Sequence, residues 1–295
     1  MTKVFGRLVT AMVTPFDQDG GVDIEAAIRL GTHLIDTGTD TILLAGTTGE
    51  SPALTFEEEK LLFKTFVDVF KGKVNIMAGT GSNCTQTAIE MTRVASSLGV
   101  DSILQVVPYY NKPCQEGLFC HFEAVSKVTD LPIMLYNIPG RTGVNLLPET
   151  VKRLAEIDHI MGLKEASGLI DQVRALKLCL PDSFSIYSGD DALTFPFLQE
   201  GACGVVSVAA HCVGSAIKKM LTAFFSGDKP LAFDCHQKLL ELFEILFIAP
   251  NPVPVKSVLN HMGFCVGSTR LPLVDASQAD VKKIISIYQS TIQSL

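Results

Sequence analysis

The sequence predicts an α/β fold, a (β/α)8 TIM barrel followed by a C-terminal helical extension. Hydrophobic residues make up 47% of the 295 residues, which suits a sheet covered on both faces. Short apolar, β-branched runs occur eight times, and segments with helical periodicity lie between them. Successive runs are roughly 20 to 35 residues apart, the size of one βα unit. Eight such units are expected to close into a barrel.

The eight apolar runs are the expected strands of this barrel. In chain order they are residues 7–13, 41–46, 74–79, 102–108, 132–137, 160–166, 184–189 and 204–208. Small or polar residues end each run, as is typical of buried strands that lead into loops. The runs and their intervening helices occupy residues 1–225, which we interpret as the catalytic barrel.

Helix boundaries between the strands have recognisable signals. Thr55 and Glu58 have the spacing of a capping box just before an apolar periodic segment. Pro148 is expected at the start of another helix. Gly72 and Gly99 are expected to end two more helices.

A doubly wound open sheet is the alternative architecture. Such a sheet usually has fewer strands and a glycine-rich phosphate loop after its first strand. Here the first run leads into TPFDQDG, residues 14–20, so the closed barrel is preferred. Residues 226–295 continue as helical segments, and no Ser/Gly-rich linker precedes them. We therefore expect a helical extension packed on the barrel.

Composition excludes several classes of function. A net charge of −7 without clustered Lys or Arg argues against nucleic acid as a partner. No apolar stretch is long enough to cross a membrane, and no targeting signal is recognised at the N-terminus. Eight scattered cysteines without a C-x-x-C pair favour reduced thiols in the cytoplasm. Six histidines without H-x-x-x-H or H-x-H spacing predict no metal site.

Polar residues gather where the expected strands end. Barrel enzymes carry their chemistry at the carboxyl ends of the strands. In this sequence those ends are GTTGE (46–50), PYYN (108–111), YNIPGRTG (136–143), KE (164–165), SGDD (188–191) and VS (206–207). A lysine, tyrosines, hydroxyl groups and an arginine therefore converge on one mouth of the barrel.

Lys164 is the candidate nucleophile, because it lies within an otherwise apolar strand. An ordinary lysine has a pKa near 10.4, so only about one in 2,500 is neutral at pH 7. Burial can lower that pKa by several units. The neutral amine can then attack a ketone and form a Schiff base. The alternative is a lysine whose head pairs with Glu165 or reaches solvent.

The neighbouring strand ends supply groups for the same chemistry. A tyrosine phenol there can pass a proton to and from the carbinolamine, whereas Tyr109 is interpreted as packing at an interface. Thr47 could bridge two phenols. Thr48 and the backbone of its loop could hold a carboxylate. Arg141 is a natural carboxylate clamp, although a surface arginine on a loop is the alternative.

Five segments carry a resemblance to a known family. They are GTTGES (46–51), VVPYYNKP (106–113), LYNIPGRTG (135–143), GLKEASG (162–168) and SGDD (188–191). They resemble the signature segments of the dihydrodipicolinate synthases, within the pyruvate-dependent class I aldolase superfamily that includes N-acetylneuraminate lyase. The likeness covers essentially the whole chain. The arginine after LYNIPG marks the synthase branch.

The resemblance implies a metal- and cofactor-independent lyase that condenses pyruvate with L-aspartate 4-semialdehyde. This reaction is the entry step to diaminopimelate and lysine. By the same resemblance, Lys164 forms the Schiff base and Tyr136 donates and accepts protons. Thr47 relays protons between Tyr136 and Tyr110, and Tyr110 comes from a neighbouring subunit.

The resemblance also implies how the substrates and subunits are held. Thr48, Val206 and Gly189 would bind the pyruvate end. Arg141 would bind the carboxylate of the semialdehyde. The family is typically a homotetramer built as a dimer of dimers, so the same assembly is expected here.

The resemblance extends in part to a regulatory lysine site at the dimer interface. Three residues match the family pattern: Ser51, Asn83 and Tyr109. Three depart from it, with Phe56 and Glu59 in place of histidines and Thr87 in place of an acid. The ammonium of a bound lysine would lose its carboxylate partner. We therefore expect weak or absent inhibition by lysine.

Two other functions remain open from the sequence. One is a pyruvate aldolase of another substrate, such as a 2-keto-3-deoxy sugar acid. The other is a barrel that retains a pyruvate pocket for binding without turnover. The lysine–tyrosine–threonine set argues against the second, because a binder needs no proton relay.

Overall fold

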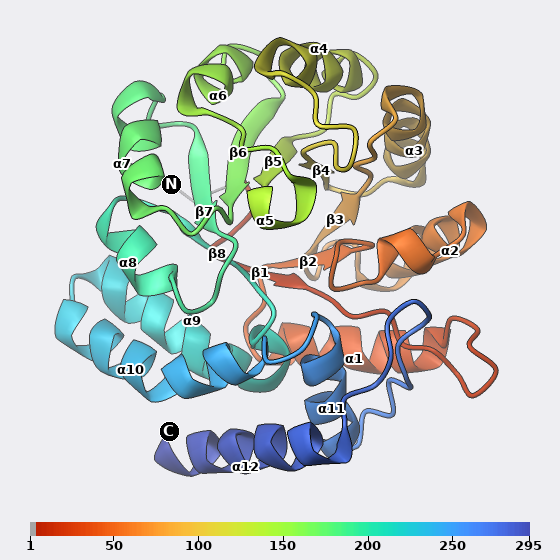
Figure 1. Cartoon of the computed structure of the whole chain (residues 1–295), viewed down its shortest axis with the longest axis vertical. Coiled ribbons are helices and arrows are strands. Elements are labelled where there is room, and N and C mark those ends of the chain that lie inside the picture. The colour runs from red at the N-terminus through yellow and green to blue at the C-terminus, as the bar shows by residue number, and fades with distance from the viewer. Residues whose placement is uncertain (1–3) are drawn as a thin grey trace.

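The computed structural model describes residues 4–295 and contains a closed barrel of eight parallel strands (Figure 1). The strands pair in chain order, and β8 pairs with β1. They are β1 (Leu8–Ala11), β2 (Thr41–Leu44), β3 (Asn75–Gly79), β4 (Ser102–Val106), β5 (Ile133–Asn137), β6 (Ile160–Glu165), β7 (Ser185–Ser188) and β8 (Gly204–Ser207). The predicted barrel is confirmed, and the open doubly wound sheet is wrong.

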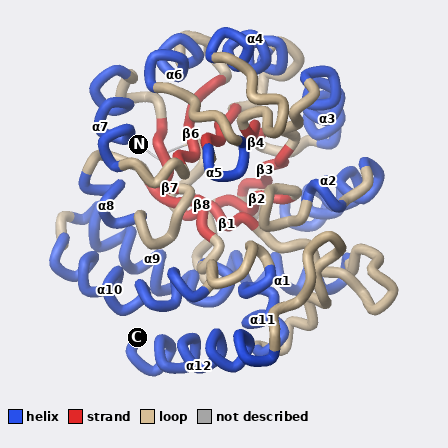
Figure 2. The backbone as a smooth tube through the Cα atoms, viewed as in Figure 1, coloured by secondary structure: helices blue, strands red, loops and turns tan. Residues whose placement is uncertain are grey.

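Helices form a ring outside the strands (Figure 2). One longer helix follows each of the eight strands, and α5 and η1 are short additions. The ring contains α1 (Ile24–Asp36), η1 (Ser51–Ala53), α2 (Phe56–Phe70), α3 (Thr85–Leu98), α4 (Gln115–Ser126), α5 (Pro139–Thr142), α6 (Pro148–Leu154), α7 (Ile170–Cys179), α8 (Thr194–Gln199) and α9 (Ala210–Ser226). Neither α5 nor η1 was expected from the sequence.

The predicted helix boundaries agree with the structure. The Thr55 hydroxyl accepts a hydrogen bond from the backbone of Glu58, whose side chain accepts one from the backbone of Thr55, so the capping box is present. Pro148 is the first residue of α6. Gly99 caps the end of α3 with φ 85°, a left-handed conformation that glycine adopts without strain. Gly72 follows the last turn of α2.

Two apolar layers pack the barrel. Side chains alternate along each strand, so one set fills the interior and the other meets the helices. The interior cluster comprises Phe5, Val9, Ala11, Leu43, Met77, Leu104, Met134, Tyr136, Tyr187, Cys203 and Val206. The larger cluster lies between the strands and the helices and continues under the C-terminal helices. A polar side chain inside this barrel is therefore surrounded by apolar groups.

Three further helices follow the barrel: α10 (Lys229–Ile245), α11 (Val253–His261) and α12 (Gln278–Ser294). The helix α10 packs along α9, and α12 packs on α10 and α11 (Figure 1). On α11, Lys256 forms a buried ion pair with Glu50, with 2.7 Å between Nζ and Oε1. The backbone N–H of Arg270 donates to the other oxygen of Glu50 at 2.9 Å. These contacts join the C-terminal segment to the loop that follows β2.

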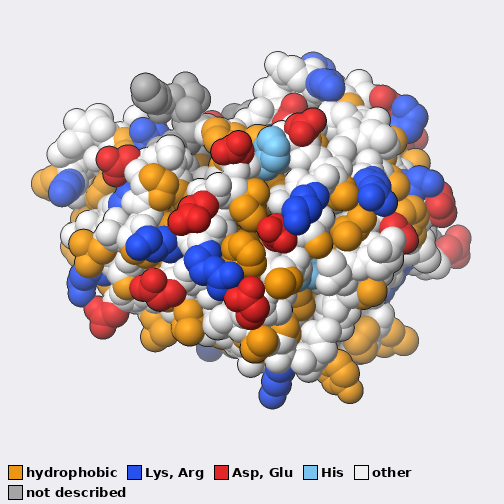
Figure 3. All heavy atoms as spheres, turned by 90° about the horizontal axis from the view of Figure 1, so that it is seen from above, with side chains coloured by type: hydrophobic (Ala, Val, Ile, Leu, Met, Phe, Trp, Pro, Cys, Tyr) orange, Lys and Arg blue, Asp and Glu red, His pale blue; other side chains and the backbone are white. Residues whose placement is uncertain are grey.

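Charges of both signs share the surface. On the face shown in Figure 3, acidic and basic side chains are interspersed, and neither sign forms a large continuous patch. Within residues 4–295, no helix has the length and apolar character needed to span a membrane.

Candidate active site

Lys164 and Tyr136 lie next to each other inside the barrel. They are paired across β5 and β6, and both side chains are buried, with 6% and 4% of their surfaces exposed. The Nζ atom of Lys164 lies 4.1 Å from the centroid of the Tyr136 ring. The structure therefore brings the candidate nucleophile and the candidate proton donor together.

Burial changes the protonation of Lys164. Loss of hydration in the apolar barrel lowers the pKa of this lysine to about 7, although the nearby carboxylate of Asp191 opposes the shift. The guanidinium of Arg141 lowers the pKa of Lys164 further. With a pKa near 7, about half of the amines are neutral at pH 7. A neutral amine is the form that can attack a carbonyl.

The adjacent carboxylate does not neutralise Lys164. Glu165 points to the opposite side of β6, as alternation along a strand requires. It accepts hydrogen bonds from the side chains of Asn137 and Gln172 and from the backbone of Ser167. Among the described residues, Lys164 forms no ion pair. The alternative in which Lys164 pairs with Glu165 is therefore wrong.

Tyr136 is held as a neutral phenol. Burial raises the pKa of Tyr136 to about 12, while the charge of Arg141 and a hydrogen bond with the Thr47 side chain act in the opposite direction. A phenol that stays protonated can donate a proton to a nearby oxygen. Its contact with Thr47 gives the proton a path along hydroxyl groups.

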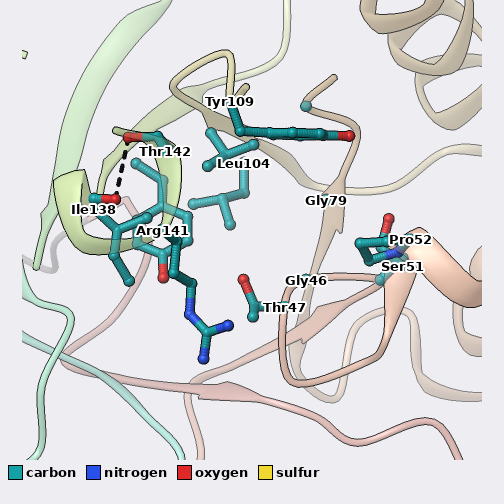
Figure 4. Close-up of a pocket in the computed structure, with 14 residues that line it drawn as sticks. Gly46, Thr47, Ser51, Pro52, Gly79, Leu104, Tyr109, Ile138, Arg141 and Thr142 are labelled. Atoms are coloured by element: carbon teal, nitrogen blue, oxygen red, sulfur yellow. Dashed lines mark hydrogen bonds between the residues drawn. The ribbon is translucent and has the colours of Figure 1, made fainter. Parts of the chain in front are cut away.

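A cavity of about 230 Å³ lies beside Tyr136 and Thr47, which both line it, whereas Lys164 is not among its lining residues. Its lining comes mainly from the strand ends and from α5: Ala45, Gly46, Thr47, Ser51, Pro52, Gly79, Gly81, Leu104, Val106, Tyr109, Tyr136, Ile138, Arg141 and Thr142. Figure 4 shows the guanidinium of Arg141 extending toward Thr47. Arg141 lies on the short helix α5 and lines the cavity, so it is not placed on a loop away from the site.

Gly189 lies beside Lys164 just after β7, and Val206 lies on β8. A Cβ atom on Gly189 would lie 2.7 Å from the Cβ of Ala166 and 3.1 Å from the Cε of Lys164. Only glycine therefore leaves room for the lysine stem. Val206 is buried inside the barrel on β8 and pairs with Val9.

Thr48 and Tyr110 do not line the cavity. The Thr48 hydroxyl is buried and accepts a hydrogen bond from Nδ2 of Asn251 at 2.9 Å. Tyr110 has φ 74°, and 88% of its side chain is exposed. The first residue faces the C-terminal segment and the second faces outward from its own barrel.

Asp191 is a buried carboxylate for which the sequence predicts no role. Its Oδ2 accepts hydrogen bonds from the backbones of Val208 and Ala209, both at 2.9 Å, and within residues 4–295 no hydrogen bond reaches its Oδ1. Burial raises its pKa, and those backbone donors oppose the rise. Its place in SGDD at a strand end was a signal, but nothing in the sequence indicated its nearness to Lys164.

A family model matches residues 4–290 of this chain, and it describes the dihydrodipicolinate synthetase family. The chain belongs to the dihydrodipicolinate synthetase family. A 4-hydroxy-tetrahydrodipicolinate synthase of Thermosynechococcus vestitus is 53% identical over 96% of this chain and 96% of its own. The likeness thus extends over nearly the full length of both proteins.

Solved structures of dihydrodipicolinate synthases have the same fold. The synthase of Cyanidioschyzon merolae with lysine bound has a TM-score of 0.97 and 46% identity, over 98% of this chain and 99% of that one. The chloride-inhibited synthase of Acinetobacter baumannii complexed with pyruvate has a TM-score of 0.95 and 38% identity, over 97% of this chain and 99% of that one.

Two of the three residues that match the family's lysine-site pattern line the same cavity. Ser51 and Tyr109 line it, whereas Asn83 contacts the next loop through its backbone oxygen, which accepts a hydrogen bond from Asn111. Ser51 donates to Oε1 of Glu59 at 2.8 Å. Burial raises the pKa of Glu59 to about 7, although the Ser51 hydrogen bond opposes the rise. The Ser51 hydroxyl is thus already engaged within this chain.

The other two departures from the family pattern lie at the surface. Phe56 is the first residue of α2 and is 39% exposed. Thr87 is exposed in the first turn of α3. Among residues 4–295, no group of three or more His, Cys, Asp or Glu side chains is placed to hold a metal ion.

Proposed function

We propose that this protein is a 4-hydroxy-tetrahydrodipicolinate synthase. It condenses pyruvate with L-aspartate 4-semialdehyde to 4-hydroxy-tetrahydrodipicolinate, the entry step of diaminopimelate and lysine biosynthesis. The observation that carries this proposal is a lysine of lowered pKa against a neutral tyrosine, in a chain 53% identical to a named synthase. The test is to supply pyruvate with either the semialdehyde or a sugar aldehyde. Turnover of the sugar aldehyde alone would contradict the proposal.

The reaction begins with the neutral amine of Lys164. Its lone pair attacks the keto carbon of pyruvate and forms a carbinolamine, and loss of water gives a protonated Schiff base. The cationic nitrogen withdraws electrons, so the methyl carbon loses a proton and an enamine forms. The enamine carbon then attacks the aldehyde carbon of the semialdehyde, and the resulting alkoxide takes up a proton. The amino group of the former semialdehyde then displaces the Lys164 amine from the imine carbon, which closes the ring and frees the lysine. Tyr136, hydrogen-bonded to Thr47, is placed to carry the protons in these steps.

The two substrates need different binding groups around the reacting amine. We assign Gly189, Val206 and the backbone of the loop at Thr48 to the pyruvate end, since Gly189 and Val206 follow Lys164 around the barrel and the Thr48 hydroxyl is engaged by Asn251. The related synthase of Acinetobacter baumannii is known in complex with pyruvate. We assign Arg141 to the carboxylate of the semialdehyde, because a guanidinium can bind a carboxylate through two parallel hydrogen bonds.

Replacing Arg141 by alanine should impair the second substrate selectively. We expect kcat/KM for the semialdehyde to fall about 10- to 100-fold, because a charge-assisted hydrogen bond is lost. Borohydride trapping of pyruvate should change much less, because burial, and not Arg141, is the largest cause of the lowered pKa of Lys164. Steady-state kinetics with each substrate varied in turn measures the difference. Arg29→Ala, at an exposed position on α1, is the control. It should change neither kcat/KM for the semialdehyde nor the rate of pyruvate trapping. An equal loss for both substrates would contradict this assignment.

The pH dependence of pyruvate capture should follow Lys164. Because its pKa is lowered to about 7, the reactive neutral form increases as pH rises through 7. We expect kcat/KM for pyruvate to rise with pH up to about 8 and then level off. An unperturbed lysine would instead give a rise that continues to about pH 10. Initial rates at constant ionic strength from pH 5.5 to 10 distinguish the two.

The working assembly is, in our proposal, a homotetramer built as a dimer of dimers. Tyr110 supports this view, because it projects into solvent and away from the cavity of its own barrel. In a dimer it can enter the partner's site and extend the hydroxyl path from Tyr136 and Thr47. The exposed aromatic side chains of Phe56 and Tyr109 suit a subunit contact.

Lysine should inhibit this enzyme weakly or not at all. The related synthase of Cyanidioschyzon merolae has been solved with lysine bound. In this chain, Ser51 is engaged by Glu59, and Thr87 cannot pair with an ammonium group. We expect activity to persist in millimolar lysine, and a micromolar inhibition constant would contradict the expectation. Thr87→Glu restores an acid and should lower the inhibitory concentration.

We further propose that the enzyme acts in the cytoplasm. Its eight cysteines are free thiols in the structure, four of them exposed at the surface. Free surface thiols suit a reducing compartment.

A further inference from the structure

A polar network lies directly behind the reacting pair, on the outer face of β5 and β6. Tyr136 pairs with Lys164 inside the barrel, and the next residues, Asn137 and Glu165, pair on the outside. Both outer side chains are fully buried between the strands and the helices. Polar groups buried in this layer are retained only when hydrogen bonds satisfy them.

Glu165 accepts three kinds of N–H donor. The Nδ2 of Asn137 lies 3.0 and 3.2 Å from its two oxygens, and the backbone of Ser167 donates at 2.6 Å. The Nε2 of Gln172 on α7 donates at 2.9 Å. No lysine or arginine among the described residues forms an ion pair with this carboxylate. Amide N–H groups therefore hold this carboxyl group in place.

The same network closes the loop that carries Arg141. This loop leaves β5 at Asn137 and returns at Leu146, whose backbone N–H donates to Oδ1 of Asn137 at 2.9 Å. The Nδ2 of Asn137 also donates to Oδ1 of Asn145 at 2.7 Å. The Nδ2 of Asn145 in turn donates to Oε1 of Gln172 at 2.7 Å. Both ends of the loop are thus fixed to one asparagine.

Strand position and loop position are therefore coupled through one set of hydrogen bonds. Lys164 precedes Glu165 on β6, and Arg141 lies on α5 within the closed loop. A shift of the carboxylate would release Asn137 and Gln172 together. The loop would then lose its anchors, while the apolar interior around Lys164 would remain.

We propose that Glu165 and Asn137 are positioning residues that set Arg141 at a fixed place relative to Lys164. The inference rests on the proposed function, because it concerns the fit of the second substrate. These residues touch no substrate and act through the loop. Their loss should weaken use of the semialdehyde more than capture of pyruvate.

The first test replaces Glu165 by glutamine, which keeps the shape but turns an acceptor into a donor. The new amide NH2 group replaces one of the two accepting oxygens. At least one N–H group of Asn137, Gln172 or Ser167 then faces another N–H group and loses its hydrogen bond. We expect KM for the semialdehyde to rise about 10- to 100-fold. The rate of borohydride trapping with pyruvate should stay within about threefold. Equal losses for both substrates, or no loss, would overturn the proposal.

A rescue separates this role from a general loss of stability. The variant Glu165→Asp keeps a carboxylate at this position, so the N–H groups of Asn137, Gln172 and Ser167 again face an acceptor. KM for the semialdehyde should return to within about threefold of the wild type. Asn145→Ala is the second variant. It leaves the carboxylate intact, should fold even if Glu165→Gln does not, and should show the same selective rise in KM.

The matched control is Asp40→Asn at the opposite end of the barrel. Asp40 is a carboxylate that accepts hydrogen bonds from the backbones of Arg7 and Leu8 and pairs with Lys218. Its replacement should lower Tm without separating the two substrates. A selective rise in KM in this control would overturn the proposal. If the wild type itself fails to trap pyruvate, the proposed function fails instead.

Discussion

Replacing Lys164 by methionine should lower kcat by about 10⁴-fold or more, because the group that forms the covalent intermediate is removed. Methionine fills a similar volume, so the barrel interior should remain packed. Activity is measured as product formation from pyruvate and the semialdehyde. Circular dichroism and thermal unfolding test whether the variant is folded. Full activity in a folded Lys164→Met variant would refute the mechanism.

Reductive trapping identifies the lysine directly. Sodium borohydride with pyruvate should add one reduced adduct, located by mass spectrometry on the peptide that contains Lys164. Lys256 is an internal control, because it is also buried but is ion-paired with Glu50. Its peptide should stay unlabelled. Lys152→Met, at an exposed position on α6, should retain both labelling and activity.

Replacing Tyr136 by phenylalanine should lower kcat by about 10²- to 10⁴-fold, the usual contribution of a positioned proton donor. The ring that packs against Lys164 is kept, so pyruvate should still bind. Exchange of the methyl protons of pyruvate with deuterium, followed by nuclear magnetic resonance, reports the proton transfer separately from the condensation. We expect this exchange to slow in parallel with kcat.

The matched control for this variant is Tyr187→Phe. The Tyr187 phenol is also buried inside the barrel, but it donates to the backbone oxygen of Gly6 at 2.6 Å. Its loss should reduce stability by roughly 1 kcal/mol and leave proton exchange unchanged. Similar exchange rates in Tyr136→Phe and the wild type would show that another group carries the proton.

The barrel could be predicted because its signals are local. Each strand is a short apolar run, and each helix has its own periodicity and caps, such as Thr55 with Glu58. Residues at consecutive strand ends must meet at one mouth once the barrel closes. That rule alone predicts that Lys164 and Tyr136 lie close together.

Contacts between distant parts of the chain left no such signal. Asn251 donates to Thr48 across 203 positions of sequence, and neither residue type indicates the other. The helix α5 consists of only Pro139–Thr142, too short for periodicity to reveal. The opposite directions of Lys164 and Glu165 follow from strand alternation, but the amide partners that hold Glu165 could not be read from the sequence.

The pairing of Glu50 with Lys256 has a consequence for the newly made protein. Chains are synthesised from the N-terminus, so the ribosome completes all eight strands well before Lys256 and Arg270 emerge. Until then Glu50 has no cation, and the threonine loop that contains it lacks its support. We expect a truncated product that ends before residue 256 to be inactive from synthesis, although it contains Lys164, Tyr136 and Thr47.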